Sequence, residues 1–172
     1  LIFAGVQKNM GPAGAVLVII REDLLERVPQ GMPPMLDYRL MAENNSLYNT
    51  PPCWSIYMCG LVYQWMKKNG GVAAMHVRNE NKAKLIYDAI DNSAFYKGHA
   101  VPENRSRMNI TFTLPSEELG KQFVAEAKAE GMIELNGHRS VGGCRASIYN
   151  AFPVEGCQAL ADFMKAFELA NG

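Results

Sequence analysis

Two short apolar runs near the start of the chain are separated by a segment rich in glycine and polar residues. The first run covers residues 1–6, and the second, residues 15–20, is rich in β-branched residues and apolar on both faces. Such runs are typical of strands buried between two layers of structure. The pattern predicts two buried strands at the edge of a larger α/β sheet, most of which lies outside this chain.

The next part of the chain changes from irregular to helical patterning. Residues 23–27 predict a short helix, whereas residues 35–50 show little periodicity and read as a loop. Residues 51–52 are a Pro-Pro pair that favours a helix start, with Thr50 as the N-cap. Residues 53–69 are apolar on most faces, which predicts a helix buried on several sides and ended by a Gly-Gly pair.

The C-terminal part alternates between helical and strand patterns. Its apolar spacing predicts helices over residues 72–92, 115–131 and 154–170, and strands over residues 107–113, 132–135 and 144–148. This order is typical of a compact α+β unit with helices packed on a small sheet. We therefore place a domain boundary near Gly70, between residues 1–70 and residues 71–172.

Composition and charge narrow the class of protein. Of the 172 residues, 48% are hydrophobic and 20% charged, and 17 basic and 17 acidic residues give no net charge. This is the composition of a folded domain, without the positive charge that favours nucleic acid or an anionic membrane surface. No apolar run reaches the roughly 20 residues that cross a bilayer. We expect neither nucleic acid nor a membrane as a partner.

The four cysteines, Cys53, Cys59, Cys144 and Cys157, include no CxxC pair. A metal site is therefore not expected. We expect the thiols to be reduced and mostly buried, as in a cytoplasmic protein. The chain opens at Leu1 inside a predicted strand. We expect it to be part of a longer protein, with an organellar targeting segment ahead of it as an open alternative.

The segment between the two N-terminal runs, Gly5 to Gly14, carries the first candidate chemistry. A Walker A loop places its lysine after the last glycine and follows it with Ser or Thr, and Lys8 meets neither condition. A lysine at the end of a buried strand is desolvated, which favours a neutral amine able to form a Schiff base with pyridoxal phosphate. By spacing alone, an ordinary solvated loop lysine is the commoner case.

Two further segments combine donors for anions. Residues 137–147 place Arg139 and Arg145 on either side of a Gly-Gly pair. Arginine binds carboxylate or phosphate through paired hydrogen bonds, so the two could hold both ends of a small dianion, with a pair of surface arginines as the alternative. Asn49 and Thr50 precede a predicted helix, where free N–H groups attract anions, although plain capping by Thr50 is the simpler interpretation.

Together, these segments resemble the phosphoserine aminotransferase family of fold-type-I, pyridoxal-phosphate-dependent enzymes. The resemblance rests on residues 7–12, 46–52 and 137–147, in the family's order and spacing, and it covers the whole chain. It implies the C-terminal part of such an enzyme. Residues 1–70 would be the end of the large cofactor-binding domain, and residues 71–172 the small C-terminal α+β domain.

The resemblance also implies which residues bind the cofactor. Lys8 corresponds to the lysine that binds pyridoxal 5'-phosphate covalently and later moves a proton, and Gln7 to a side chain at the cofactor phosphate. Asn49 and Thr50 correspond to residues that reach the cofactor phosphate of the neighbouring subunit. The family's enzymes are therefore expected as homodimers with shared active sites.

For the substrate, the resemblance implies two anion-binding groups. His138 and Arg139 correspond to the pair near the substrate's phosphate, and Arg145 to the arginine that binds its α-carboxylate. The implied reaction exchanges an amino group between O-phospho-L-serine and 2-oxoglutarate, with 3-phosphohydroxypyruvate and glutamate as products, in serine biosynthesis. Other cofactor contacts of the family lie outside this chain, so we expect the chain alone to be inactive or nearly so.

Two alternatives to this interpretation stay open. The chain could be an isolated small-domain protein that serves folding, binding or dimer contacts without catalysis. It could also belong to a related fold-type-I aminotransferase that acts on a different amino acid, in which case Arg139 would confer no preference for phosphoserine.

Overall fold

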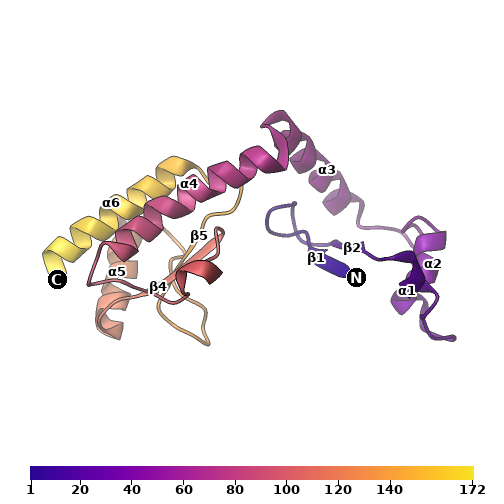
Figure 1. Ribbon diagram of the computed structural model, residues 1–172, viewed down its shortest axis with the longest axis horizontal. Helices are drawn as coiled ribbons and strands as arrows, with labels where there is room; N and C mark the ends of the chain where they lie inside the picture. Colours follow the sequence, from indigo (N-terminus) through magenta and orange to yellow (C-terminus); the bar gives the residue numbers. More distant parts are fainter. The chain divides into compact units, whose positions relative to one another are not determined.

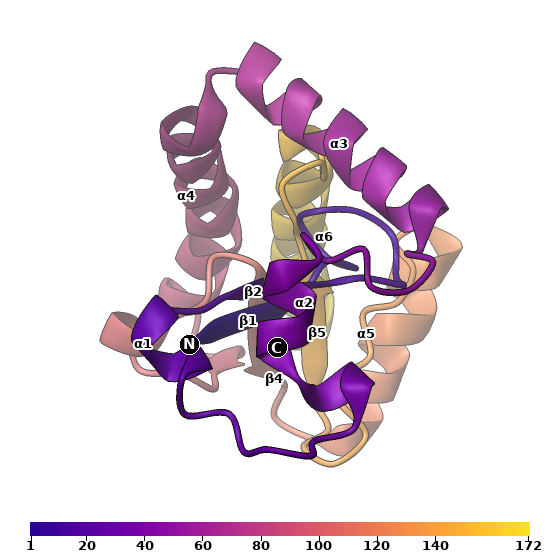
Figure 2. The same cartoon turned by 90° about the vertical axis from the view of Figure 1, so that its right-hand side faces the viewer.

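The computed structural model describes residues 1–172, which divide into two compact units, Leu1–Lys68 (unit 1) and Asn69–Gly172 (unit 2). Unit 1 opens with two antiparallel strands, β1 (Ile2–Gly5) and β2 (Val16–Ile19), paired along their whole length (Figure 2). Both strands form where they were predicted. Their predicted burial is wrong for this chain, as the 72% exposure of Phe3 shows. The strands are exposed because no second layer within unit 1 covers the two-stranded sheet.

Short helices follow the two strands of unit 1. They are α1 (Glu22–Leu25), the 3-10 helix η1 (Pro34–Leu36) and α2 (Tyr38–Glu43). The apolar pattern did not predict α2, which begins where the Asp37 carboxylate accepts hydrogen bonds from the N–H groups of Arg39 and Leu40. This helix thus depends on a local polar cap rather than on an apolar stripe.

Helix α3 (Cys53–Lys68) ends unit 1 and forms where the sequence predicted a helix. The prediction that it is buried on several sides is wrong for this chain. Its two buried residues are Ser55 and Cys59, whereas Trp54 is 68% exposed. The apolar side chains on its other faces have no covering layer within unit 1.

Unit 2 is built on a three-stranded antiparallel sheet in the order β3 (Lys97–Gly98), β4 (Asn109–Thr113) and β5 (Cys144–Ser147). Helices α4 (Gly71–Asp91), α5 (Glu117–Ala129) and α6 (Val154–Asn171) share one core with this sheet. α4 and α6 lie side by side (Figure 1). A 3-10 helix, η2 (Pro102–Asn104), lies between β3 and β4.

The core of unit 2 is centred on aromatic side chains. Phe112 of β4 and Phe123 of α5 are buried and meet edge to face, with ring centres 5.8 Å apart. Phe167 of α6 lies 5.2 Å from the Phe123 ring. One face of the sheet therefore packs against all three helices, as the α+β pattern predicted.

Local signals explain where several elements of unit 2 begin and end. The Ser116 hydroxyl accepts the N–H of Leu119 and caps α5. Gly70 separates α3 from α4 with φ 89°, a left-handed conformation that suits glycine. The strand predicted over residues 132–135 does not form, because Glu134 has φ 62°, which interrupts an extended backbone.

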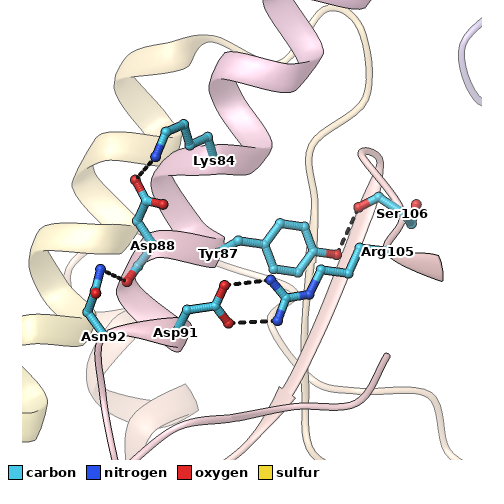
Figure 3. Close-up of polar contacts among 7 residues, drawn as sticks. All are labelled: Lys84, Tyr87, Asp88, Asp91, Asn92, Arg105 and Ser106. Atoms are coloured by element: carbon cyan, nitrogen blue, oxygen red, sulfur yellow. Dashed lines mark hydrogen bonds and ion pairs between the residues drawn. The ribbon is translucent and has the colours of Figure 1, made fainter. Parts of the chain in front are cut away.

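Arg105 fixes the segment ahead of β4 to helix α4 (Figure 3). Its guanidinium makes two hydrogen bonds of 2.6 Å to the Asp91 carboxylate and lies 4.5 Å from the centre of the Tyr87 ring. The same guanidinium holds the pKa of Asp91 below its ordinary value. The Tyr87 hydroxyl donates to the Ser106 carbonyl at 2.9 Å. These contacts set where the chain enters β4.

No helix of the structure has both the length and the apolar character that a membrane-spanning segment needs. All four cysteines are unpaired, with Cys53 exposed and the other three buried. Burial raises the pKa of Cys144 to about 11 and also raises the pKa of Cys157. The thiolate is the reactive form of cysteine, so these two thiols are both covered and protonated near neutral pH.

We therefore expect a thiol reagent at pH 8 to modify Cys53 quickly in the folded protein. Cys144 and Cys157 should react only after denaturation, because folding removes both access and thiolate character. Mass spectrometry of protein quenched at intervals measures the sites. A Cys53→Ser variant is the control, and a fast reaction that persists in it would contradict the predicted protection.

Candidate functional site

Lys8 lies in the loop that joins β1 to β2. The Val6 N–H bonds to the Ala15 carbonyl at 3.2 Å and closes the base of this loop, while the Lys8 N–H bonds to the Val6 carbonyl at 2.8 Å. Val6 is buried, but the Lys8 side chain is exposed. The prediction of a desolvated lysine is thus wrong for this chain, because the loop leaves the Lys8 side chain exposed to solvent.

Small residues bring the lysine loop against α3. The Ser55 hydroxyl donates to the Ala13 carbonyl at 2.8 Å. A Cβ at Gly14 would lie 2.4 Å from the Ser55 oxygen, and one at Gly11 would lie 2.7 Å from the Cys59 sulfur. Glycine is therefore required for this close approach of loop backbone to helix. The contact fixes the position of the loop that carries the lysine.

Gln7, Asn49 and Thr50 are exposed polar residues of the same unit. The Gln7 amide folds back over Gly5, where an added Cβ would lie 2.4 Å from Gln7 Oε1. The Asn49 amide donates to the Thr50 carbonyl at 3.2 Å, just before α3. All three side chains can supply donors to an anion. The predicted N-cap role of Thr50 is wrong, because α3 begins at Cys53 and the first helical hydrogen bond runs from the Ile56 N–H to the Pro52 carbonyl at 3.1 Å.

In unit 2, residues 137–143 form a tight loop ahead of β5. The N–H groups of Val141 and Gly142 both bond to the His138 carbonyl at 2.8 Å, and the Gly137 N–H bonds to the Gly143 carbonyl at 2.8 Å. A Cβ at Gly137 would lie 1.9 Å from the Gly142 carbonyl oxygen. The glycines therefore allow two backbone segments to meet and hold the loop closed.

This loop presents His138 and Arg139 to solvent. His138 Nδ1 lies 2.7 Å from the Ser140 hydroxyl and accepts the Ser140 N–H at 3.3 Å. Because Nδ1 accepts, a neutral ring carries its proton on Nε2, which is then a donor. The loop therefore offers an imidazole N–H and a guanidinium side by side in sequence, both suited to an anion.

Arg145 lies on β5, paired with Thr111 of β4, on the sheet face opposite the core. Its backbone N–H bonds to the Leu135 carbonyl at 2.8 Å. The side chain is half-buried, and its Nε is buried without a hydrogen-bond partner. An unpaired buried N–H is costly, so this guanidinium suits an anionic ligand.

Each unit thus carries one part of the predicted site, the first a lysine with neutral donors and the second a histidine with two arginines. Sequence reasoning missed Ser55 and Cys59, which position the lysine loop. The available signal was the presence of two small side chains one helical turn apart in a helix rich in bulky apolar residues. No group of three or more His, Cys, Asp or Glu residues is arranged to bind a metal ion.

Comparison with known proteins places these features in context. The family model for class-V aminotransferases matches residues 1–160. The phosphoserine aminotransferase of Lysinibacillus sphaericus is 64% identical over 169 residues, which are 98% of this chain and 47% of the relative. That of Geobacillus kaustophilus is 62% identical over 168 residues, 97% of this chain and 47% of the relative. The chain therefore spans about half the length of the relatives it matches.

Solved structures agree with these relatives. Phosphoserine aminotransferase from Bacillus circulans subsp. alkalophilus superimposes with a TM-score of 0.95 at 53% identity, over 99% of this chain and 47% of that one. The enzyme from Trichomonas vaginalis with pyridoxal phosphate bound has a TM-score of 0.90 at 44% identity, over 95% of this chain and 47% of that one. An alanine–glyoxylate aminotransferase from Nostoc, at 14% identity and a TM-score of 0.73, shares the fold alone.

The close approach at Gly14, where φ is 125°, leads to a stability prediction. We expect Gly14→Ala to lower the free energy of unfolding by about 2–3 kcal/mol, from backbone strain and displacement of the Ser55 hydroxyl. Gly31→Ala is the matched control, since Gly31 has φ 76° but open space around it, and should cost only about 1–2 kcal/mol. Chemical denaturation measures both, and equal losses would argue against the tight contact.

Proposed function

Since the chain belongs to the class-V aminotransferase family, we propose that it is part of a pyridoxal-phosphate-dependent phosphoserine aminotransferase. The fold expected from the sequence, that of the fold-type-I aminotransferases, is confirmed by the solved neighbours. The observation that carries the proposal is 64% identity to a phosphoserine aminotransferase over 98% of this chain. We assign residues 1–70 to the end of the large cofactor-binding domain and residues 71–172 to the small C-terminal domain.

Unit 1 has the groups that a phosphorylated aldehyde cofactor requires. Lys8 has an exposed side chain in a loop held in place by α3, and exposed amide and hydroxyl donors at Gln7, Asn49 and Thr50 suit a phosphate. Pyridoxal phosphate, when bound, withdraws electrons from the α-carbon of an amino acid. In this proposal Lys8 Nζ attaches the cofactor and moves the proton to and from that carbon, while Gln7 holds the cofactor phosphate.

Unit 2 has the groups that the substrates require. The Arg145 guanidinium, with its buried and unpaired Nε, binds the α-carboxylate that all four substrates share. His138 and Arg139 bind the distal anion, which is a phosphate in O-phosphoserine and 3-phosphohydroxypyruvate and a carboxylate in glutamate and 2-oxoglutarate. Two anion-binding groups thus explain how one site accepts both substrate pairs in the amino exchange of serine biosynthesis.

The proposal includes a second copy of the enzyme. Asn49 and Thr50 reach the cofactor phosphate bound by the partner subunit, which makes the active enzyme a homodimer. Four unpaired cysteines agree with a reducing compartment, and we place the enzyme in the cytoplasm. The chain alone spans about half the length of its relatives, so activity is expected from the longer enzyme rather than from these residues alone.

Lys8→Ala in that longer enzyme tests the cofactor assignment. We expect loss of the visible absorption band of lysine-bound cofactor and a fall in kcat of at least about 10³-fold, because both the attachment point and the proton carrier are removed. Lys67→Ala, in the exposed last turn of α3, should keep both. A Lys8→Ala enzyme that retains the band and its turnover would overturn the assignment.

Arg139→Gln tests the substrate assignment. We expect KM for O-phosphoserine to rise about 10–100-fold, since a charge-assisted hydrogen bond contributes about 1.5–3 kcal/mol, while slow turnover of alanine, which lacks a distal anion, stays within about twofold. Arg107→Gln is the control, because this exposed arginine pairs with Glu80. If phosphoserine is affected no more than alanine, the enzyme is a related aminotransferase with a different substrate.

A further inference from the structure

Lys82, in the middle of α4, is fully buried. Its Nζ donates to the carbonyl oxygens of Ile148 at 3.0 Å, Tyr149 at 2.7 Å and Phe152 at 3.2 Å. An ammonium has three N–H donors, so each donor can meet one carbonyl. Lysine is almost never fully buried unless it is paired, and here the partners are all backbone groups of one turn.

The Lys82 ammonium makes no ion pair with a carboxylate, and desolvation lowers its pKa below the ordinary value. A methionine would fill the same space without the cost of burying a charge. It would also take a donor away from all three carbonyls, of which only that of Tyr149 keeps another, the Phe152 N–H at 2.9 Å. Within the turn between β5 and α6, the carbonyls of Ile148 and Phe152 therefore depend on a cation from α4 for their hydrogen bonds.

The turn is joined directly to the strand that carries Arg145. Ile148 follows β5, and its carbonyl accepts the Lys82 ammonium while its N–H bonds to the Met108 carbonyl at 2.9 Å. Ile148 is thus held from both sides, by α4 and by the residue before β4. Arg145 lies three residues earlier on the same short strand, so the end of β5 is fixed close to it.

Side chains make a second connection between the turn and the sheet. The hydroxyls of Tyr149 and Ser147 both donate to Asn109 Oδ1, at 3.3 Å and 3.0 Å. Asn109 and Ser147 are paired across β4 and β5 and lie on the same sheet face as Arg145. A displaced turn would therefore also disturb this polar face.

Helix α4 holds the turn at a further point. The Asn79 amide, one turn before Lys82, donates to Asn150 Oδ1 at 2.7 Å, and both residues are buried. Buried and directional contacts of this kind restrict a backbone more than apolar packing does. The turn after β5 thus has little freedom as long as Lys82 is present.

We infer that Lys82 is a positioning residue for substrate binding, which holds the turn after β5 so that Arg145 stays where it binds the α-carboxylate. This inference rests on the proposed function, which assigns that role to Arg145. Lys82 itself touches neither substrate nor cofactor. Its loss should weaken binding of every substrate that carries an α-carboxylate and leave cofactor attachment at Lys8 unchanged.

The test compares Lys82→Met with Ile90→Ala in the longer enzyme. Ile90 is a buried residue of the same helix, so Ile90→Ala lowers stability without touching the turn. For Lys82→Met we expect KM for all four substrates to rise about tenfold or more, with the cofactor band intact. Lys82→Arg keeps a cation with N–H donors, so its KM values should lie closer to those of the unmodified enzyme.

Amide hydrogen exchange of Arg145, whose N–H bonds to the Leu135 carbonyl, gives a readout that does not depend on activity. We expect the exchange of the Arg145 amide to be at least about tenfold faster in Lys82→Met than in the unmodified enzyme. In Ile90→Ala, the same exchange should be unchanged relative to the global unfolding rate. If Lys82→Met changes neither the KM values nor the exchange of the Arg145 amide, the inference is overturned, and Lys82 has only a structural role in the core. If the unmodified enzyme does not act on phosphoserine, the proposed function fails, and the exchange result alone decides the link between Lys82 and Arg145.

Discussion

The alternation of apolar and polar side chains along β4 and β5 is the constraint on which unit 2 depends. Ile110 and Phe112 face the helices, paired with Ala146 and Cys144 of the neighbouring strand. Successive side chains of a strand point to opposite faces, so the pairing that builds the core also places Arg145 on the other face. A shift of one residue in this register would expose the core and bury the arginine. Stability and the proposed carboxylate site are therefore set by the same pairing.

Unit 1 is organised by a different constraint, the close approach of the lysine loop to α3. Two glycines and two small helix residues make that approach, and the Ser55 hydroxyl bonds to the loop backbone. Large apolar side chains such as Phe3, Trp54 and Tyr57 stay exposed. These exposed apolar side chains agree with contacts to further protein in a chain that spans about half the length of its relatives.

Most helices and strands could be predicted because their signals are local or periodic. The amphipathic pattern of α4, the Ser116 cap of α5 and the glycine before α4 are all legible in the sequence. Elements without such a pattern were missed or wrong. Helix α2 depends on the Asp37 cap, and residues 132–135 read as a strand until the positive φ of Glu134 is known. The site residues could be named from motifs. The exposure of Lys8 could not be predicted, since it depends on which parts of the protein cover the loop.

The sequence by itself determined the order of elements, the three segments that carry the chemistry and the family to which they belong. Only the tertiary structure decided which polar residues support those segments. Lys82 reads as one more charged residue on an amphipathic helix, yet its three acceptors lie 66, 67 and 70 residues further along the chain. Periodicity specifies the face on which a side chain lies. It does not specify the partner that side chain meets, because that partner is brought there by the packing of α4 against the turn before α6.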